Sequence, residues 1–280
     1  MNKRRVSKKV NKHKKTHWGS VASWYDDYIG QEGSEFHQTI IMPGIVKMLR
    51  STYKSVEGLN IIDFACGQGV LCRYLSKRGA RCTGIDLAKE LIDKAKERSN
   101  ETNIDYLVGD VTSLLNEDGS LKFGLKENSF DAITIVLAIQ NISPLTPVWK
   151  AAYSLLKKGG SLIIVMMHPC FRIPQSSDWN FNNDLHRQER VLWRYLVSHE
   201  VSIDAHPGKK ASGKKSASTI HFHRPLQSYI NTLGNARLYI EHIDEWVSNK
   251  KEQEGVKSEE LMRAKSEIPM FLAIQARKLD

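Results

Sequence analysis

A short turn of small residues follows the first apolar run of the chain and is its clearest candidate for ligand chemistry. Residues 59–64 read LNIIDF, and residues 63–69 read DFACGQG, so that Asp63 stands just before the turn. Small residues let a ligand approach the backbone N–H groups of such a turn, at the edge of a parallel sheet where ligands bind. The turn therefore predicts a cofactor site.

The spacing of the glycines argues against a dinucleotide. The dinucleotide fingerprint needs glycines at positions i, i+2 and i+5. A register that begins at Ala65 places Val70 at the last position, and a register that begins at Gly67 places Cys72 there. The carboxylate of Asp63 would also repel a pyrophosphate. An acid at this place suits a cationic ligand instead.

Two more acids stand at the ends of the next predicted strands. Asp86 ends the segment 81–86, and Asp110 ends the segment 104–110. Asp86 has a second explanation as the N-cap of the following helix, since Asp is a favoured capping residue. Asp110 has one as the start of an Asx turn. Acids at the ends of three consecutive strands favour a shared ligand over three separate local roles.

The pattern D-x-A-C-G-x-G resembles motif I of the class I S-adenosylmethionine-dependent methyltransferases, with Ala65 in place of the usual first glycine. The resemblance implies that Asp86 binds both ribose hydroxyls of S-adenosyl-L-methionine. It also implies that Asp110 faces the adenine amino group and that the backbone N–H of Val111 meets the ring. The cofactor contacts expected in this way are Asp63, Ala65, Cys66, Gly67, Gly69, Asp86, Leu87, Asp110, Val111 and Leu137.

His168 follows the fifth predicted strand, 161–167, and is the candidate general base. Its place at the carboxyl edge directs it toward a substrate cavity, and imidazole titrates near neutrality. Packing of the lid, or a hydrogen bond to the backbone, explains His168 equally well. The resemblance implies that Tyr25 and His37 shape the acceptor pocket, and we also place Gln140 and His168 there.

A metal site is not expected. Six of the ten histidines lie between 168 and 223, and His221 and His223 fall on one face of a predicted strand. No third ligand stands at a standard spacing from them. None of the four cysteines forms a CxxC pair. Lining of a substrate lid, or exposure at the surface, explains these histidines.

The segments that would position these residues alternate between strand and helix, which predicts βαβ units. We therefore expect an α/β fold with a doubly wound, seven-stranded, mostly parallel sheet. By the resemblance it is the Rossmann-like methyltransferase fold, whose last strand is antiparallel. The predicted strands are 59–64, 81–86, 104–110, 130–139, 161–167, 237–246 and 268–278, and the predicted helices between them are 68–78, 87–100, 146–158 and 224–235.

Four parts follow from this pattern: a basic disordered tail at 1–16, an N-terminal helical cap at 17–56, a cofactor-binding domain at 57–170 and 225–280, and an inserted substrate lid at 171–224. The cap reads as helices that are broken near Gly30 and at Pro43. Its Trp18 is expected only to pack the helices against the sheet. The lid is expected to pair 191–203 with 218–224 as a β-hairpin.

Composition excludes several classes of protein. Of the 280 residues, 41% are hydrophobic and 26% are charged, which is ordinary for a globular chain and unlike collagen or a disulfide scaffold. No apolar run reaches the roughly 18 residues that cross a bilayer, so we expect no membrane insertion. Because no disulfide framework is indicated, and no apolar stretch follows the basic start, we expect a cytoplasmic location.

The net charge of +10 comes mostly from the first 16 residues, which hold eight Lys and Arg and no acid. Without these eight, 33 basic and 31 acidic residues remain, so the rest of the chain is nearly neutral. Tails of this kind are usually solvated, and some contact RNA or anionic lipid.

These observations predict methyl transfer from S-adenosyl-L-methionine to an O, N or C nucleophile of a small-molecule acceptor, because a cap and a lid would enclose the pocket. Two alternatives stay open. An RNA-modifying methyltransferase would use the basic tail, which makes nucleic acid the alternative partner. A non-catalytic regulator would bind the cofactor without turnover. The sequence does not indicate the oligomeric state.

Overall fold

The computed structural model describes residues 18–204, 218–250 and 258–279, so the predicted tail at 1–16 lies outside the described residues. Seven strands form the main sheet of the described chain. They are β1 (Asn60–Phe64), β2 (Arg81–Asp86), β3 (Ile104–Val108), β4 (Phe130–Val136), β5 (Leu156–Met167), β10 (Leu238–Trp246) and β11 (Phe271–Lys278).

The strand order is β10-β11-β5-β4-β1-β2-β3. Neighbours from β5 to β3 run parallel, whereas β11 is antiparallel to both β5 and β10. The order reverses between β1 and β4, which is where a doubly wound sheet opens a crevice at its carboxyl edge. The predicted doubly wound, mostly parallel fold with an antiparallel last strand is therefore confirmed.

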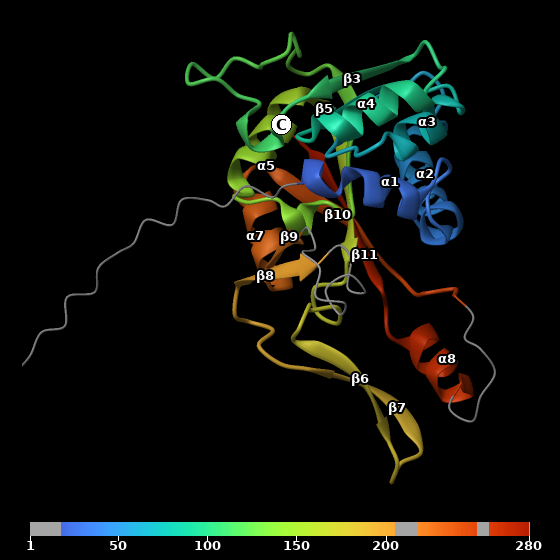
Figure 1. Cartoon of the computed structure of the whole chain (residues 1–280). Coiled ribbons are helices and arrows are strands. Elements are labelled where there is room, and N and C mark those ends of the chain that lie inside the picture. Colours follow the sequence, from blue (N-terminus) through green and yellow to red (C-terminus); the bar gives the residue numbers. More distant parts are fainter. Residues whose placement is uncertain (1–17, 205–217, 251–257, 280) are drawn as a thin grey trace, which may run out of the picture.

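Helices cover both faces of this sheet (Figure 1). One hydrophobic core joins the sheet to α5 (Thr146–Leu155) and α7 (Leu226–Asn235). Trp149 of α5 is fully buried in it, and its indole N–H donates to Thr232 of α7 at 3.0 Å. The second core joins the opposite face to α2 (Met42–Tyr53), α3 (Val70–Ser76) and α4 (Lys89–Arg98). Each helix buries the apolar stripe that its periodicity provides.

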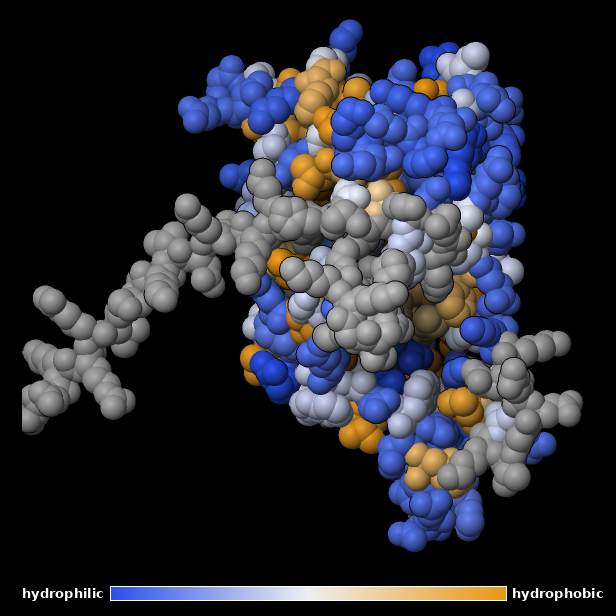
Figure 2. All heavy atoms as spheres, viewed as in Figure 1, coloured by the Kyte–Doolittle hydropathy of each residue, from blue (hydrophilic) through white to orange (hydrophobic). Residues whose placement is uncertain are grey.

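Smaller elements surround the carboxyl edge of the sheet. They are η1 (Trp18–Val21), α1 (Ala22–Ile29), η2 (His37–Ile41), η3 (Val111–Ser113), η4 (Ile139–Asn141), β6 (Ser177–Asn182), β7 (Arg187–Leu192), β8 (His199–Asp204), β9 (Ser218–His223) and α8 (Ser258–Glu267). None of the described helices combines the length and the apolar composition that crossing a bilayer requires. The surface over α3 and α4 is mostly hydrophilic, and hydrophobic atoms gather below it (Figure 2).

The lid differs from its prediction. β8 pairs with β9 as an antiparallel ribbon, in agreement with the expected hairpin. Residues 191 and 192 belong instead to β7, which pairs with β6 in a second hairpin. This hairpin projects away from the sheet (Figure 1). The sequence of β6, SDWNFN, is largely polar, so it lacks the apolar content by which a strand is recognised.

Several predicted boundaries are wrong, among them the strand expected over 130–139, which ends at Val136. The helix expected over 146–158 ends at Leu155, because Leu156 already pairs with Phe130 as the first residue of β5. The break expected at Pro43 is absent, since η2 is a π-helical turn that leads directly into α2. Pro43 is the second residue of α2, directly after the π-helical turn.

A polar network attaches the N-terminal segment to the glycine-containing turn after β1. Arg98 donates to the side-chain oxygen of Gln68 at 2.5 Å and to the carboxylate of Asp26 at 2.7 Å. The side-chain amide of Gln68, in the turn itself, donates to the backbone oxygen of Gly30 at 3.0 Å. These contacts fix α1 beside the turn, although the two are about 40 residues apart in sequence.

The turn needs glycine at its last position for two reasons. Gly69 has a φ of +76°, in the left-handed region. A Cβ on Gly69 would also lie 2.2 Å from the hydroxyl oxygen of Tyr106 on β3. Gly69 is also the N-cap residue of α3, so the Tyr106 ring packs against the start of this helix.

Gly69→Ala should therefore lower the free energy of unfolding by about 2–4 kcal/mol, because backbone strain adds to a steric clash. Gly30→Ala is the matched control, since Gly30 also has a positive φ of +69° but nothing lies within 4 Å of a Cβ there. We expect the control to show only the strain part, about 1 kcal/mol. Urea unfolding of both variants measures the difference, and equal losses would contradict the packing argument.

Candidate functional site

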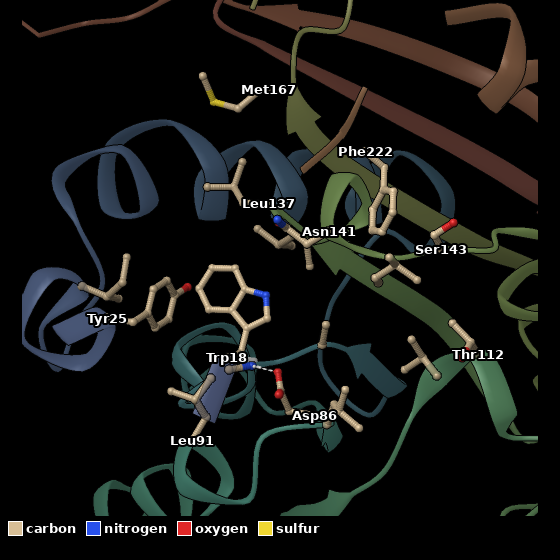
Figure 3. A pocket seen from close by; sticks show the side chains of 18 of the residues that line it. Trp18, Tyr25, Asp86, Leu91, Thr112, Leu137, Asn141, Ser143, Met167 and Phe222 are labelled. Carbon is tan, nitrogen blue, oxygen red and sulfur yellow. Dashed lines mark hydrogen bonds between the residues drawn. The ribbon is translucent and has the colours of Figure 1, made fainter. Parts of the chain in front are cut away.

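A cavity of about 600 Å³ opens at the carboxyl ends of β1 to β5. Its volume lies within the roughly 300–1,000 Å³ of small-molecule sites. The turn after β1 and the ends of β2 and β3 form one side of it. The segment after β4, the end of β5, the start of β11 and the N-terminal helices form the rest. Figure 3 shows side chains from these separate elements converging on one space.

Most of the predicted site residues line this cavity. From the expected cofactor contacts these are Ala65, Gly67, Asp86, Leu87, Asp110, Val111 and Leu137, and from the expected acceptor pocket they are Tyr25 and His37. The chain thus brings together residues from four strand ends and the N-terminal segment. Which of them bind the cofactor, and which the acceptor, stays a prediction.

Three expected cofactor contacts lie behind the cavity wall. Asp63 is 4% exposed, and its carboxylate accepts from the hydroxyl of Thr134 at 2.6 Å. The thiol of Cys66 lies under the turn, and burial raises its pKa to about 11. Gly69 packs against Tyr106. In this structure these residues support the turn rather than line the cavity.

The expected position of His168 is corrected by the structure. Its Nδ1 accepts from the backbone N–H of Cys170 at 3.2 Å, so the proton resides on Nε2, which donates to the carboxylate of Glu245 at 2.7 Å. Side chains alternate along a strand, and Met167 takes the side that faces the cavity. His168 is 2% exposed, and burial lowers its pKa. Both ring nitrogens are occupied away from the cavity.

Gln140 is also absent from the cavity lining. It is buried in η4, and its side-chain amide donates back to the carbonyl of Leu137 at 2.9 Å. Leu137 itself has a φ of +52° and faces the cavity. Gln140 therefore stabilises the sharp turn after β4 that presents Leu137.

The carboxylate of Asp86 is the centre of the predicted cofactor side. It accepts from the backbone N–H of Gly67 at 2.9 Å and from that of Ala88 at 2.8 Å. The bond to Ala88 forms a local turn and not the expected N-cap, because α4 begins at Lys89 and its N-cap residue is Ala88. The bond to Gly67 joins two loops. Burial raises the pKa of Asp86, and these hydrogen bonds oppose the rise. The same side chain lines the cavity, which is compatible with its predicted ligand role.

Asp110 likewise combines a local contact with a place in the cavity lining. One of its carboxylate oxygens accepts from the backbone N–H of Thr112 at 2.8 Å and caps η3. Thr112 and Val111 lie beside it in the cavity wall. Leu87 is 43% exposed at the same wall, which leaves an apolar surface between the two acids.

Several lining residues were not predicted. Trp18 was expected only to pack helices, but its indole lies between Asp86 and Leu137, beside the ring of Tyr25 (Figure 3). Phe222 reaches the cavity from β9 in the lid. Because His221 and His223 share the other face of β9, the alternation of the strand contains a signal for Phe222. No such signal exists for Trp18, whose position depends on the fold of the cap.

The lid is held at the cavity by a side chain of the sheet edge. Asn141, which lines the cavity, donates to the backbone oxygen of Ile220 on β9 at 2.8 Å.

In the part of the chain that the structure describes, no group of three metal-ligating side chains comes together.

The comparisons with known proteins agree with this geometry. Residues 62–164 match a family described as a methyltransferase domain. A ubiquinone biosynthesis O-methyltransferase of Xanthomonas euvesicatoria pv. vesicatoria (strain 85-10) is 34% identical over 116 residues, which are 41% of this chain and 45% of that protein. The match thus spans less than half the length of the curated relatives.

Solved structures resemble most of the chain. An S-adenosylmethionine-dependent methyltransferase from Mesorhizobium loti is 25% identical with a TM-score of 0.61, covering 82% of this chain and 96% of that one. A Listeria monocytogenes protein assigned to the same class has a TM-score of 0.61 at 21% identity, covering 85% and 99%, and shows the shared fold. Residues 62–164 therefore match a methyltransferase domain, and most of the chain resembles solved S-adenosylmethionine-dependent methyltransferases.

The residues present fit the cofactor of this family. The carboxylate of Asp86 faces the cavity with lone pairs beyond the two that its backbone partners use. An apolar wall at Leu87 and Val111 lies next to it for a flat ring. The backbone N–H of Val111 and the carboxylate of Asp110 belong to the same part of the cavity lining, after β3. The family's S-adenosylmethionine therefore meets suitable groups at this site.

Asp63→Asn tests the pKa of the buried acid. Burial raises the pKa of Asp63 from 3.8 to about 7, with the hydrogen bond from Thr134 opposing the rise and Asp86 adding to it. Because the unfolded chain releases this proton at lower pH, the wild type should lose stability as the pH rises from about 4 to about 7. An amide does not ionise. The free energy of unfolding of Asp63→Asn, relative to that of the wild type, should therefore increase by about 1–3 kcal/mol between pH 5 and pH 8.

Urea unfolding at the two pH values measures this change. Asp93→Asn is the control, because Asp93 is exposed on α4 and pairs with Lys89 at the surface. Parallel stability profiles for wild type and Asp63→Asn would contradict the raised pKa.

Proposed function

We propose that the protein transfers the methyl group of S-adenosyl-L-methionine to a small, apolar acceptor molecule. The observation that carries this proposal is the composition of the cavity wall. Acids from β2 and β3 and the glycine turn from β1 occupy one side. The other side is mostly apolar, and no Lys or Arg is among the described residues that line the cavity. Such a wall supports a neutral acceptor rather than an RNA backbone.

S-adenosyl-L-methionine supplies a methyl group on a positively charged sulfur that is also its own leaving group. The residues of this chain need to bind the cofactor and the acceptor, orient them and exclude water. Positioning accounts for much of the acceleration in such a transfer. Asp86 and Asp110 would hold the nucleoside. Because Gly67 has no side chain, the ligand could lie close to the backbone of the turn after β1. Tyr25 and Trp18, whose rings meet edge to face at 5.5 Å, would cover it from the cap.

The relatives support an oxygen acceptor. The curated proteins matched over part of their length are named ubiquinone biosynthesis O-methyltransferases, and their name places methyl transfer on oxygen. The cap and the lid both contribute apolar side chains here, through Phe36 and Phe222. A partly enclosed apolar site of this kind selects small molecules. Incubation with labelled S-adenosyl-L-methionine and fractionated cell extract tests whether label enters small molecules or RNA.

Asp86→Ala should weaken binding of S-adenosyl-L-methionine by about 1.5–3 kcal/mol, roughly ten- to a hundredfold, because charge-assisted hydrogen bonds are lost. Titration calorimetry measures this, and NAD should give no binding. Since Asp86 also supports the turn, Leu87→Ala is the second variant: Leu87 is 43% exposed, so its truncation should cost affinity with little change in stability. Asp93→Ala is the control. Unchanged affinity in Asp86→Ala would contradict the assignment of Asp86 to the cofactor.

Deletion of residues 1–16 separates the two acceptor classes. A segment with eight basic residues and no acid buries little, so folding and cofactor affinity should not change. On a small-molecule acceptor we expect full turnover. An RNA-modifying enzyme would instead bind bulk tRNA with steep salt dependence and lose turnover in the deletion. Loss of turnover on the true acceptor would favour the RNA alternative, and cofactor binding without any turnover would favour a regulator.

A further inference from the structure

We propose that His37 is the general base of this site and that the acceptor is a neutral, ring-borne hydroxyl such as a phenol. The inference rests on the proposed function and names the substrate class and the residue that accepts its proton. His37 lines the cavity from the N-terminal segment, and the acids Asp86 and Asp110 line the same cavity from the ends of β2 and β3. It replaces His168, both of whose ring nitrogens are occupied elsewhere.

The hydrogen bonding of His37 suits a base. Its Nδ1 lies 2.8 Å from the hydroxyl oxygen of Ser34, three residues earlier. When Nδ1 carries the proton and donates to Ser34, the lone pair of Nε2 is free to accept a proton. No described residue forms a hydrogen bond with Nε2, and this atom is not among the buried polar atoms that lack a partner. Nε2 therefore has no hydrogen-bond partner among the described residues, on a side chain that lines the cavity.

The backbone around His37 is specialised for this placement. His37 begins the π-helical turn η2, and the N–H of Met42 donates to its carbonyl. Such turns are rare and concentrate at functional sites. Gly33, with a φ of +90°, lies against the ring: a Cβ there would be 2.7 Å from Cβ of His37. The π-helical turn and the close approach of Gly33 thus position His37 at the cavity wall.

The surroundings of His37 indicate the acceptor. Phe36, Phe271 and Met167 line the cavity with it, and no described lining residue carries a positive charge. The lining side chains therefore offer an anionic acceptor no counter-charge, which favours a neutral acceptor. The ionisable side chains of the same cavity are Asp86, Asp110 and Tyr25. Burial and the nearby acids raise the pKa of Tyr25, so it stays protonated and does not compete as a base.

The proposed step conserves atoms and charge. The acceptor oxygen forms a bond to the methyl carbon, and the carbon–sulfur bond breaks and leaves its electron pair on sulfur. The hydroxyl proton moves to Nε2 of His37, while Nδ1–H keeps its bond to Ser34. The imidazolium then releases the proton to solvent as the products leave. The products are a methyl ether, a neutral thioether and one proton.

The burial of His37 sets the pH dependence. Burial lowers the pKa of His37 to about 4, and no neighbouring charge contributes. The neutral imidazole, which is the active form, is therefore present at every pH above about 4. We expect turnover on a neutral phenol to be level from pH 6 to pH 8 and to fall as the pH approaches 4.

Two phenols test the proton transfer at pH 8.5. 4-Propylphenol stays mostly neutral there, since an ordinary phenol has a pKa near 10, whereas the carbonyl group of 4-hydroxybenzaldehyde acidifies its hydroxyl and leaves it ionised. His37→Gln should lower turnover on the neutral phenol by about 10²–10⁴-fold. On the ionised phenol we expect a loss of less than about tenfold, because no proton remains to be removed. His242→Gln, at an exposed histidine of β10, is the matched control and should change neither rate.

Ser34 is a positioning residue in this scheme. Ser34→Ala should lower turnover on the neutral phenol by about tenfold, and Ser34→Thr should restore most of it by keeping the hydroxyl. Equal losses on both phenols in His37→Gln, or no loss, would overturn the assignment of the base. Failure of the wild type to methylate either phenol while it binds cofactor would overturn the acceptor class.

Calorimetric affinity for S-adenosyl-L-methionine is measured on every variant and separates the two proposals. Normal cofactor affinity in His37→Gln shows that the variant is folded. If the wild type bound no cofactor, or transferred no label to any fraction of cell extract, the proposed function itself would fail. A failure confined to the comparison of the two phenols leaves that function standing.

Discussion

Two backbone N–H groups from separate loops meet on the buried carboxylate of Asp86, and the wall of the cavity that is predicted to bind the cofactor depends on this contact. The donors belong to Gly67, in the turn after β1, and to Ala88, at the start of α4. Removing a carboxylate from water is costly unless hydrogen bonds replace the lost hydration. Here the two replacements also fix the distance between neighbouring loops. A ligand that bridges β1 and β2 therefore meets a surface that is already assembled.

The sequence predicted that these residues lie together, because the determinants are local. Asp86, Asp110 and Gly67 each lie at the end of a strand or within three residues after it, and parallel strands bring such ends to one edge. Once the alternation of strands and helices was recognised, the position of these residues followed without knowledge of any distant contact. The antiparallel β11 and the helices on both faces followed from the same alternation and from the family resemblance.

The acceptor side could not be predicted in the same way, since distant segments build it. The position of His168 depends on Glu245 in β10, 77 residues away, which binds the ring on the side opposite the cavity. The position of Trp18 depends on how the cap folds over the turn. The β6–β7 hairpin was missed because its first strand is polar. Residues 191–192 consequently had no visible partner except the segment that forms β9.

The cap and the cofactor turn are mechanically one unit, which links the two sides of the cavity. Arg73 of α3 is 4% exposed and donates to the backbone oxygens of Gln68, in the turn, and Gln31, in the segment after α1. Arg98 joins Gln68 to Asp26 of α1 in parallel.

The partly buried ion pair between Arg98 and Asp26 adds little net stability, because desolvation offsets most of its attraction. The effect of the two arginines here is on position: the polypeptide that carries Tyr25 and His37 is tied to the turn after β1. A displacement of the turn would shift that wall of the cavity with it. Under the proposed function, the alignment of donor and acceptor for an in-line transfer would therefore depend on arginines that do not line the cavity.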